Sequence, residues 1–136
     1  MDSHIYLLDT DVCSYIMKRS HQRLLDKLCA VDLERIVISV VTEAELLYGV
    51  KLSPKNKQAK VSFDGFIKHV RVIDWGREAA EHYAEIRSYL RKRGEMIGAN
   101  DLMIAAHARS LSATIVTNNE REFRRVKGLA LENWTQ

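Results

Sequence analysis

The chain alternates between short apolar runs and longer stretches in which apolar residues recur every three or four positions. Short apolar runs bounded by polar residues are typical of strands buried inside a parallel sheet. They predict strands at residues 5–8, 36–39, 70–73 and 113–117, with a last edge strand at 129–134.

The longer stretches predict helices. The clearest covers residues 77–93, with four side chains on one face: Ala79, Tyr83, Ile86 and Leu90. Others are predicted after Asp9 or Thr10, around 24–28, and at 41–50, 55–67 and 100–111, with a short helical turn at 118–123. In the helix at 41–50, Val40, Ala44 and Leu47 are predicted to share one face.

Strands separated by helices predict an α/β fold. The expected architecture has three layers, with a mostly parallel central sheet of about five strands covered by helices on both faces. The 136 residues suit one domain, and one proline and six glycines leave no linker, so a single domain over residues 1–136 is expected.

Composition and charge narrow the function classes. No apolar run approaches the roughly 20 residues that span a bilayer, and the first residues lack a secretory signal pattern. Two cysteines without metal-type spacing are expected to be reduced, so the cytoplasm is the expected compartment. Net charge is +3, and arginine-rich stretches at 87–93 and 121–128 indicate either solvated helix faces or contacts to a polyanion.

Four acids are predicted to meet at one edge of the sheet. Asp9 and Glu122 follow strands, while Glu45 and Asp101 lie in the first turns of helices that begin at the carboxyl ends of strands. Clustered carboxylates repel one another unless a cation joins them. Oxygen ligands favour Mg²⁺ or Mn²⁺, which activate water and offset charge on phosphate, so phosphodiester hydrolysis is the predicted chemistry.

Each acid also has a purely structural explanation. Asp9 and Asp101 suit helix N-caps, and Asp11 suits a first-turn acid that meets the helix dipole. Helical periodicity does not choose between Glu43 and Glu45, which lie about 200° apart.

Other polar residues near the predicted edge are open to two interpretations. Glu122 needs no function as a surface acid among arginines, and His107 suits a satisfied core histidine. Ser39 and Thr117 end strands, where each either orients a carboxylate or bonds to backbone.

Four stretches carry a resemblance to a known family: LLDTDVCSYI, SVVTEAELLYG, GANDLMIAAHA and IVTNNEREF. They resemble the PIN-domain ribonucleases, in particular the VapC-type toxins of toxin–antitoxin pairs, over nearly the whole chain. The resemblance assigns Asp9, Glu45 and Asp101 as metal ligands, which selects Glu45 over Glu43. Its variable fourth acid aligns with either Asn119 or Glu122. The usual LDTN opening reads LDTD here, which leaves the role of Asp11 open.

The resemblance implies an endoribonuclease that uses Mg²⁺ or Mn²⁺ to cleave RNA, commonly tRNA. It also implies a homodimer and a VapB-type antitoxin that inserts a segment into the acidic groove and alone contacts operator DNA. The implied catalytic set is Asp9, Glu45, Asp101 and Glu122, with Thr10, Ser39, Thr117 and Asn119 in support. The candidates for holding the RNA backbone are Arg87, Arg91, Arg93, Arg121 and Arg124.

Three other readings compete with the nuclease. The DTD motif also resembles haloacid-dehalogenase-like phosphatases, with Asp9 as nucleophile and Asp11 as general acid, although no convincing lysine motif follows. A receiver-type signalling domain requires a lysine after a late strand, where TNN stands instead. A non-catalytic binding module with capping acids is the third.

Overall fold

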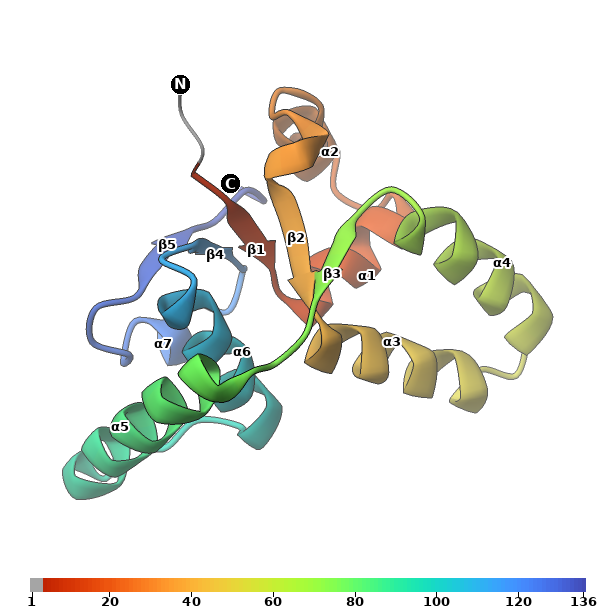
Figure 1. Cartoon of the computed structure of the whole chain (residues 1–136). Helices are drawn as coiled ribbons and strands as arrows, with labels where there is room; N and C mark the ends of the chain where they lie inside the picture. Colours follow the sequence, from red (N-terminus) through yellow and green to blue (C-terminus); the bar gives the residue numbers. More distant parts are fainter. Residues whose placement is uncertain (1–3) are drawn as a thin grey trace.

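A parallel sheet runs through the centre of the molecule (Figure 1). The computed structural model describes residues 4–136, and within this range five strands pair in the order β3-β2-β1-β4-β5, all of them parallel. The strands are β1 (Tyr6–Leu8), β2 (Ile36–Ser39), β3 (Arg71–Ile73), β4 (Thr114–Val116) and β5 (Ala130–Glu132). The predicted α/β class and strand positions are thus confirmed, with β5 at an edge.

The strand order reverses between β1 and β4, which pair side by side with Tyr6 opposite Thr114 and Leu8 opposite Val116. The chain moves outward from β1 to β2 and β3, then returns to place β4 and β5 on the other side of β1. Open parallel sheets bind ligands beyond the carboxyl ends of the strands at such a reversal. Residues that directly follow β1 and β4 therefore occupy the position where a site is expected.

Helices cover both faces of the sheet (Figure 1). They are α1 (Thr10–Lys18), α2 (Gln22–Cys29), α3 (Val40–Leu52), α4 (Asn56–Ile67), α5 (Arg77–Arg93), α6 (Ala99–Ser110) and α7 (Glu120–Phe123), with a 3₁₀ turn η1 (Leu33–Arg35). The helix predicted at 77–93 matches α5 at both ends, and the other predicted helices agree within a few residues.

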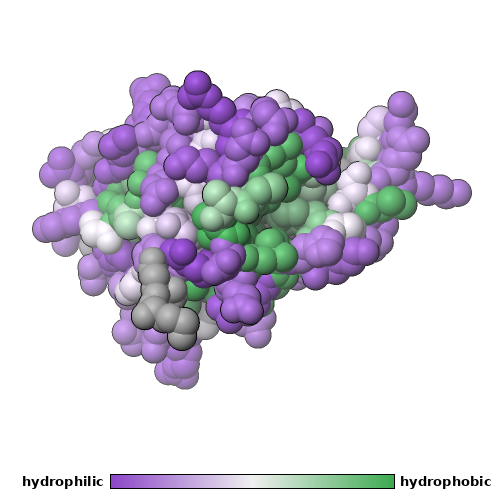
Figure 2. Space-filling model, turned by 90° about the horizontal axis from the view of Figure 1, so that it is seen from above, coloured by the Kyte–Doolittle hydropathy of each residue, from purple (hydrophilic) through white to green (hydrophobic). Residues whose placement is uncertain are grey.

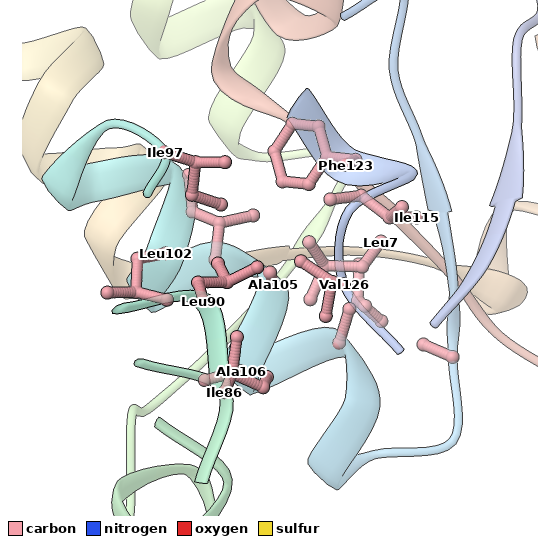
Figure 3. Packing of buried hydrophobic residues seen from close by; sticks show 14 residues of the cluster. Leu7, Ile86, Leu90, Ile97, Leu102, Ala105, Ala106, Ile115, Phe123 and Val126 are labelled. Carbon is pink, nitrogen blue, oxygen red and sulfur yellow. The ribbon is translucent and has the colours of Figure 1, made fainter. Parts of the chain in front are cut away.

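Successive residues of each strand point to opposite faces, so the sheet divides the core in two. Leu7 and Ile115 pack with the helices α5, α6 and α7 through residues such as Leu90, Ala105 and Phe123 (Figure 3). On the opposite face, the packing residues come from β1, β2, β4, α1, α2, α3 and α4: Leu8, Ile36, Ile38, Val116, Val12, Leu24, Leu46 and Phe63.

The predicted face of α3 is wrong. Thr42, Leu46 and Val50 are its buried residues, whereas Ala44 is exposed and Leu47 retains 37% of its surface. The sequence VVTEAELLYGV places apolar side chains around most of the helix, so spacing alone does not define a buried stripe. Packing of α3 against the end of the sheet and α1 selects the face instead.

Figure 2 shows a hydrophobic hollow on the face that is seen from above. It lies between α1, α2 and α4, and its lining includes Ile16, Met17, Leu28, Leu33, Phe66 and Val70. Leu33 retains 51% of its surface. Exposed apolar surface of this kind commonly marks a place where a protein partner binds. Within the described part of the chain, no helix is long and apolar enough to cross a membrane.

Candidate functional site

Asp9 lies directly after β1 and has both carboxylate oxygens in use. Oδ1 accepts a hydrogen bond of 2.8 Å from the backbone N–H of Val12, so Asp9 is the N-cap of α1. Oδ2 accepts a hydrogen bond from the Thr117 hydroxyl, which comes from the end of β4. Only 3% of Asp9 is exposed. The predicted cap is therefore present, and the same side chain also joins the two strands at the reversal point.

Burial is the main influence on the charge of Asp9. It raises the pKa of this carboxyl from 3.8 to about 6, and the negative charges of Asp11 and Glu45 add to the rise. The hydrogen bonds from Thr117 and Val12 act in the opposite direction, but they do not offset the loss of solvent. At neutral pH the edge of the sheet therefore holds a buried negative charge, and among residues 4–136 the groups that shift the pKa of Asp9 include no cation.

Glu45, in the second turn of α3, faces the same edge. Thr10 donates to Glu45 Oε1 at 2.6 Å, and Asn100 Nδ2 donates to Glu45 Oε2 at 2.9 Å. These donors come from the first turns of α1 and α6, so Glu45 joins three helices. Glu43 takes no part in these two bonds.

Asp101 and Glu122 form a coupled pair of acids. Asn119 Nδ2 lies 2.6 Å from Glu122 Oε2 and 3.5 Å from Asp101 Oδ2, and the N–H of Gly98 donates to Glu122 Oε1 at 3.1 Å. Asp101 is the third residue of α6, whose N-cap is Gly98, so the cap reading of Asp101 is wrong. Glu122 and Asn119, the two candidates for the fourth acidic position, lie in contact with each other.

The two carboxyl groups of this pair hydrogen-bond to each other, which requires a proton on one of them. Burial, the bond to Glu122 and the charges of Glu122, Asp9 and Glu45 raise the pKa of Asp101 to about 7. The pKa of Glu122 is lowered, mainly by the bond from Asp101 and further by Asn119, Gly98 and Arg125. Below about pH 7 Asp101 therefore holds the proton of the pair in preference to Glu122.

The charges of Asp9, Glu45 and Glu122 all act on Asp101, but neutral groups bond to the carboxylates. Within residues 4–136, no three side chains of His, Cys, Asp or Glu converge into a ready-made metal cluster. Instead Thr10, Asn100, Thr117 and Asn119 donate to the carboxylates. The carboxylate oxygens at this edge fit Mg²⁺, since Mg²⁺ binds oxygen atoms, keeps several of its waters and needs only one or two direct carboxylates. The excess negative charge at this edge also favours a cation, because clustered carboxylates repel one another.

The remaining predicted residues occupy different positions. Thr117, besides bonding Asp9, accepts a 2.9 Å bond from the N–H of Asn119. Ser39 does not contact an acid in these bonds: it caps α3 by accepting from Val41 N at 3.1 Å, and it bonds to His107 Nδ1 at 2.8 Å. His107 is buried, which lowers its pKa, and the carbonyl of Asp74 partly offsets this effect. The core reading of His107 is thus the one that the structure shows.

The structure gives the phosphatase interpretation no support. That fold requires a lysine beside Asp9, and among residues 4–136 the groups that bond to the four acids include no lysine. Asp11 is exposed and affects Asp9 through its charge.

The arginine candidates lie on α5 and α7. Arg91 lines a shallow groove on α5 together with Tyr83, Arg87, Ser88 and Lys92, and Arg87 donates to the Tyr83 hydroxyl at 3.0 Å. Arg93 pairs with Glu95 at 2.7 Å, Arg124 pairs with Glu120, and Arg121 is exposed.

Sequence reasoning missed three participants: Asn100, the N–H of Gly98 and Arg125. Asn100 directly precedes Asp101, so its place in the first turn of α6 was a usable signal. Arg125 donates to the carbonyls of Glu95 and Met96 and lowers the pKa of Glu122. Nothing in the sequence distinguishes it from the neighbouring arginines.

Comparison with known proteins gives a consistent result. The family model for the PIN domain matches residues 6–129. "Ribonuclease VapC2" of Rickettsia felis is 41% identical over 133 residues, covering 96% of this chain and 98% of the relative. "tRNA(fMet)-specific endonuclease VapC" of Shigella flexneri is 37% identical over 130 residues, covering 96% of this chain and 98% of the relative.

Solved structures agree with these relatives. The chain in the crystal structure of VapBC2 from Rickettsia felis bound to a promoter DNA fragment superposes with a TM-score of 0.90 at 39% identity, over 96% of this chain and 98% of that one. DNA-bound VapBC from Salmonella typhimurium gives a TM-score of 0.91 at 34% identity, again over 96% and 98%.

Proposed function

Because this chain belongs to the PIN-domain family, we propose that it is a metal-dependent endoribonuclease that hydrolyses phosphodiester bonds in RNA. One observation supports the proposal above the others: the carboxylates of Asp9, Glu45 and Glu122, far apart in sequence, lie near enough to Asp101 at the carboxyl edge of the sheet for all three to raise its pKa. The proposal treats residues 1–136 as a single domain of this family.

Asp9, Asp101 and Glu45 are the residues we assign to hold Mg²⁺ or Mn²⁺. Such a cation, when bound, supplies a more acidic water and offsets negative charge on the phosphate. Thr117 and the N–H of Val12 fix the direction of the Asp9 carboxylate, so it needs no rearrangement to face a cation. Asp101 would have to release its proton to hold a cation, since ligating carboxylates must be deprotonated.

Glu122 and Asn119 are assigned to the fourth position together. Asn119 supplies the amide donor that holds Glu122 beside Asp101, and the N–H of Gly98 holds its other oxygen. Each carboxylate oxygen retains a further lone pair for a water or a cation. We assign Thr10 the same orienting role toward Glu45.

The substrate is assigned as RNA, with tRNA as the first candidate because one relative is named a tRNA-specific endonuclease. Basic side chains on α5 and α7 suit contacts to the phosphate backbone, since such contacts supply most of the sequence-independent affinity for nucleic acid. The candidates remain Arg87, Arg91, Arg93, Arg121 and Arg124. The cytoplasm, where tRNA is found, is the proposed compartment.

We further propose that the chain is the toxin of a VapBC-type pair, forms a homodimer and is neutralised by a VapB-type antitoxin. Three of the similar solved structures are of VapBC pairs, two of them bound to DNA. In this proposal the antitoxin alone contacts operator DNA and inserts a segment into the acidic groove. The hydrophobic hollow between α1, α2 and α4 offers a partner apolar surface to cover.

The test is cleavage of defined RNA by the purified chain. Transcribed tRNAs are incubated with the protein in Mg²⁺, in Mn²⁺ and in EDTA, and new 5′ ends are mapped. We expect the wild-type protein to make discrete cuts that depend on the metal ion. Asp9→Asn and Asp101→Asn should not make these cuts. Mapping the ends in total cellular RNA after brief expression extends the search to other targets. Cleavage by both variants at the wild-type rate rules out the acidic site. Intact RNA in both the tRNA assay and the cellular RNA mapping rules out the nuclease activity.

A further inference from the structure

Asn100 links two helices that each carry an acid of the proposed site. It is the second residue of α6 and directly precedes Asp101. Its side-chain amide reaches Glu45 on α3, 55 residues earlier in the chain, with Nδ2 2.9 Å from Oε2. An uncharged donor thus lies between the carboxylate of α3 and the helix that carries Asp101.

The hydrogen bond from Asn100 is the second of two that restrain the carboxylate of Glu45. Thr10 of α1 occupies Oε1 at 2.6 Å, and Asn100 occupies Oε2, so the two oxygens have donors from two different helices. A free glutamate samples several rotamers, whereas two donors on opposite oxygens leave one orientation of the carboxylate. Removal of either donor releases that orientation.

A second contact between α6 and α3 restrains the position of Asn100. His107 lies seven residues further along α6, two turns away on the same face of the helix. Its Nδ1 lies 2.8 Å from the hydroxyl of Ser39, and this hydroxyl accepts from the N–H of Val41 at 3.1 Å. The hydrogen bond between Ser39 and His107 fastens α6 to the start of α3. The contact between His107 and Ser39 thereby restrains the distance between Asn100 and Glu45.

We propose that Asn100 is a positioning residue, whose amide holds the Glu45 carboxylate in the orientation that lets it act with Asp101 on the same cation. This inference rests on the proposed function, because it presupposes that Glu45 and Asp101 share a cation. An amide suits the position because it donates to a carboxylate without adding charge. Alanine removes the donor, whereas glutamine keeps it on an arm one methylene longer.

The test uses the full chain and begins with Mn²⁺ alone, without RNA. Calorimetry on Asn100→Ala is expected to show Mn²⁺ binding weakened about 10-fold, the lower end of the effect of removing a group that orients a metal ligand. Asn100→Gln is expected to recover part of the loss. Asn56→Ala, at an exposed first position of α4, is the matched control and should bind Mn²⁺ like the wild type.

A double-mutant cycle separates positioning from a general effect on the fold. If Asn100 acts through Glu45, then Asn100→Ala adds little to the loss of Mn²⁺ affinity already caused by Glu45→Ala. Losses that add in full overturn the proposal, and so does an Asn100→Ala protein that binds Mn²⁺ like the wild type. In NMR spectra, the side-chain amide signal of Asn100 should move when Glu45 is replaced by alanine, and a signal that stays in place also overturns the proposal.

RNA cleavage provides the last measurement. Asn100→Ala is expected to lower kcat about 10-fold with little change in KM, because the substitution disturbs the cation and not the contacts to RNA. An unchanged kcat overturns the role of Asn100 while leaving the nuclease intact. Absence of cleavage by the wild-type protein overturns the proposed function, and the role of Asn100 is then judged by the Mn²⁺ cycle and the NMR signal.

Discussion

The hydroxyl of Thr117 donates a hydrogen bond to Asp9 Oδ2 across the point where the strand order of the sheet reverses. The two residues lie 108 positions apart, and each directly follows a central strand. The bond therefore forms only after β1 and β4 have paired. It orients the most buried acid of the proposed site and lowers a pKa that burial raises.

Replacement of Thr117 by valine tests this relationship. Valine keeps the shape but leaves one oxygen of Asp9 without its donor, so the unfolding free energy at pH 7.5 should fall by about 1.5–3 kcal/mol, the value of a hydrogen bond to a charged group. Urea denaturation in EDTA measures this loss. The loss should shrink at pH 5, because Asp9 is then largely protonated.

The control for Thr117→Val is Thr114→Val on the same strand. Thr114 is also buried, but its hydroxyl bonds to His4 at the other end of β4. Thr117→Val should weaken Mn²⁺ binding and Thr114→Val should not. Equal Mn²⁺ affinities for the two variants would argue against an orienting role for Thr117.

The stability of the metal-free protein should fall as the pH rises from about 5 to 7.5. Asp9 and Asp101 have pKa values raised from 3.8 to about 6 and about 7, so the folded state holds protons that the unfolded state has released. Stability decreases with pH wherever the folded state binds more protons, here by an amount on the order of 1–3 kcal/mol.

His107 acts in the opposite direction, because a lowered pKa makes the folded state lose stability as the pH falls below 6.5. The informative quantity is therefore the difference between the wild type and Asp101→Asn, measured by urea denaturation in EDTA at several pH values. The variant should lose the part of the pH dependence that Asp101 causes. Parallel curves for the two proteins would show that Asp101 does not titrate in this range.

Divalent cations should stabilise the folded protein more at pH 7.5 than at pH 5.5. Protons compete with the cation for Asp9 and Asp101, and a ligand that binds only the folded state raises its stability by mass action. The measurement is the shift of the melting temperature on adding Mn²⁺ or Mg²⁺ at the two pH values. Asp101→Asn should show a much smaller shift, and a shift that is equal in both proteins would place the cation elsewhere.

Arg91→Ala should raise KM for RNA several-fold while leaving kcat nearly unchanged. Arg91 lines the groove on α5 together with Arg87 and Lys92, so it is expected to hold phosphate and not to take part in the reaction. Removal of one phosphate contact should reduce the slope of log affinity against log salt by about 0.7–0.9. The control is Lys57→Ala on α4, which covers the opposite face of the sheet. Equal effects of the two variants would indicate that RNA binds through overall charge alone.

Local patterns in the sequence were sufficient for most of the secondary structure. The helix Arg77–Arg93 was predicted at both ends, because its apolar spacing and the following Gly94 are properties of adjacent residues. Gly94 indeed ends the helix with φ 66°, a conformation that glycine adopts without strain. The placement of the acids at one edge of the sheet was predictable for a more general reason: parallel strands bring residues that follow them to one edge.

The sequence by itself determined the order of strands and helices along the chain, the edge of the sheet at which the acids lie and the family to which the chain belongs. Only the tertiary structure decided that α3 buries Thr42 and not Leu47, that Asn119 bonds to Glu122, and that Asn100 bonds to Glu45. The physical reason is range. Strand and helix patterns depend on neighbours in the chain, whereas these contacts depend on side chains that meet only when distant segments have packed together.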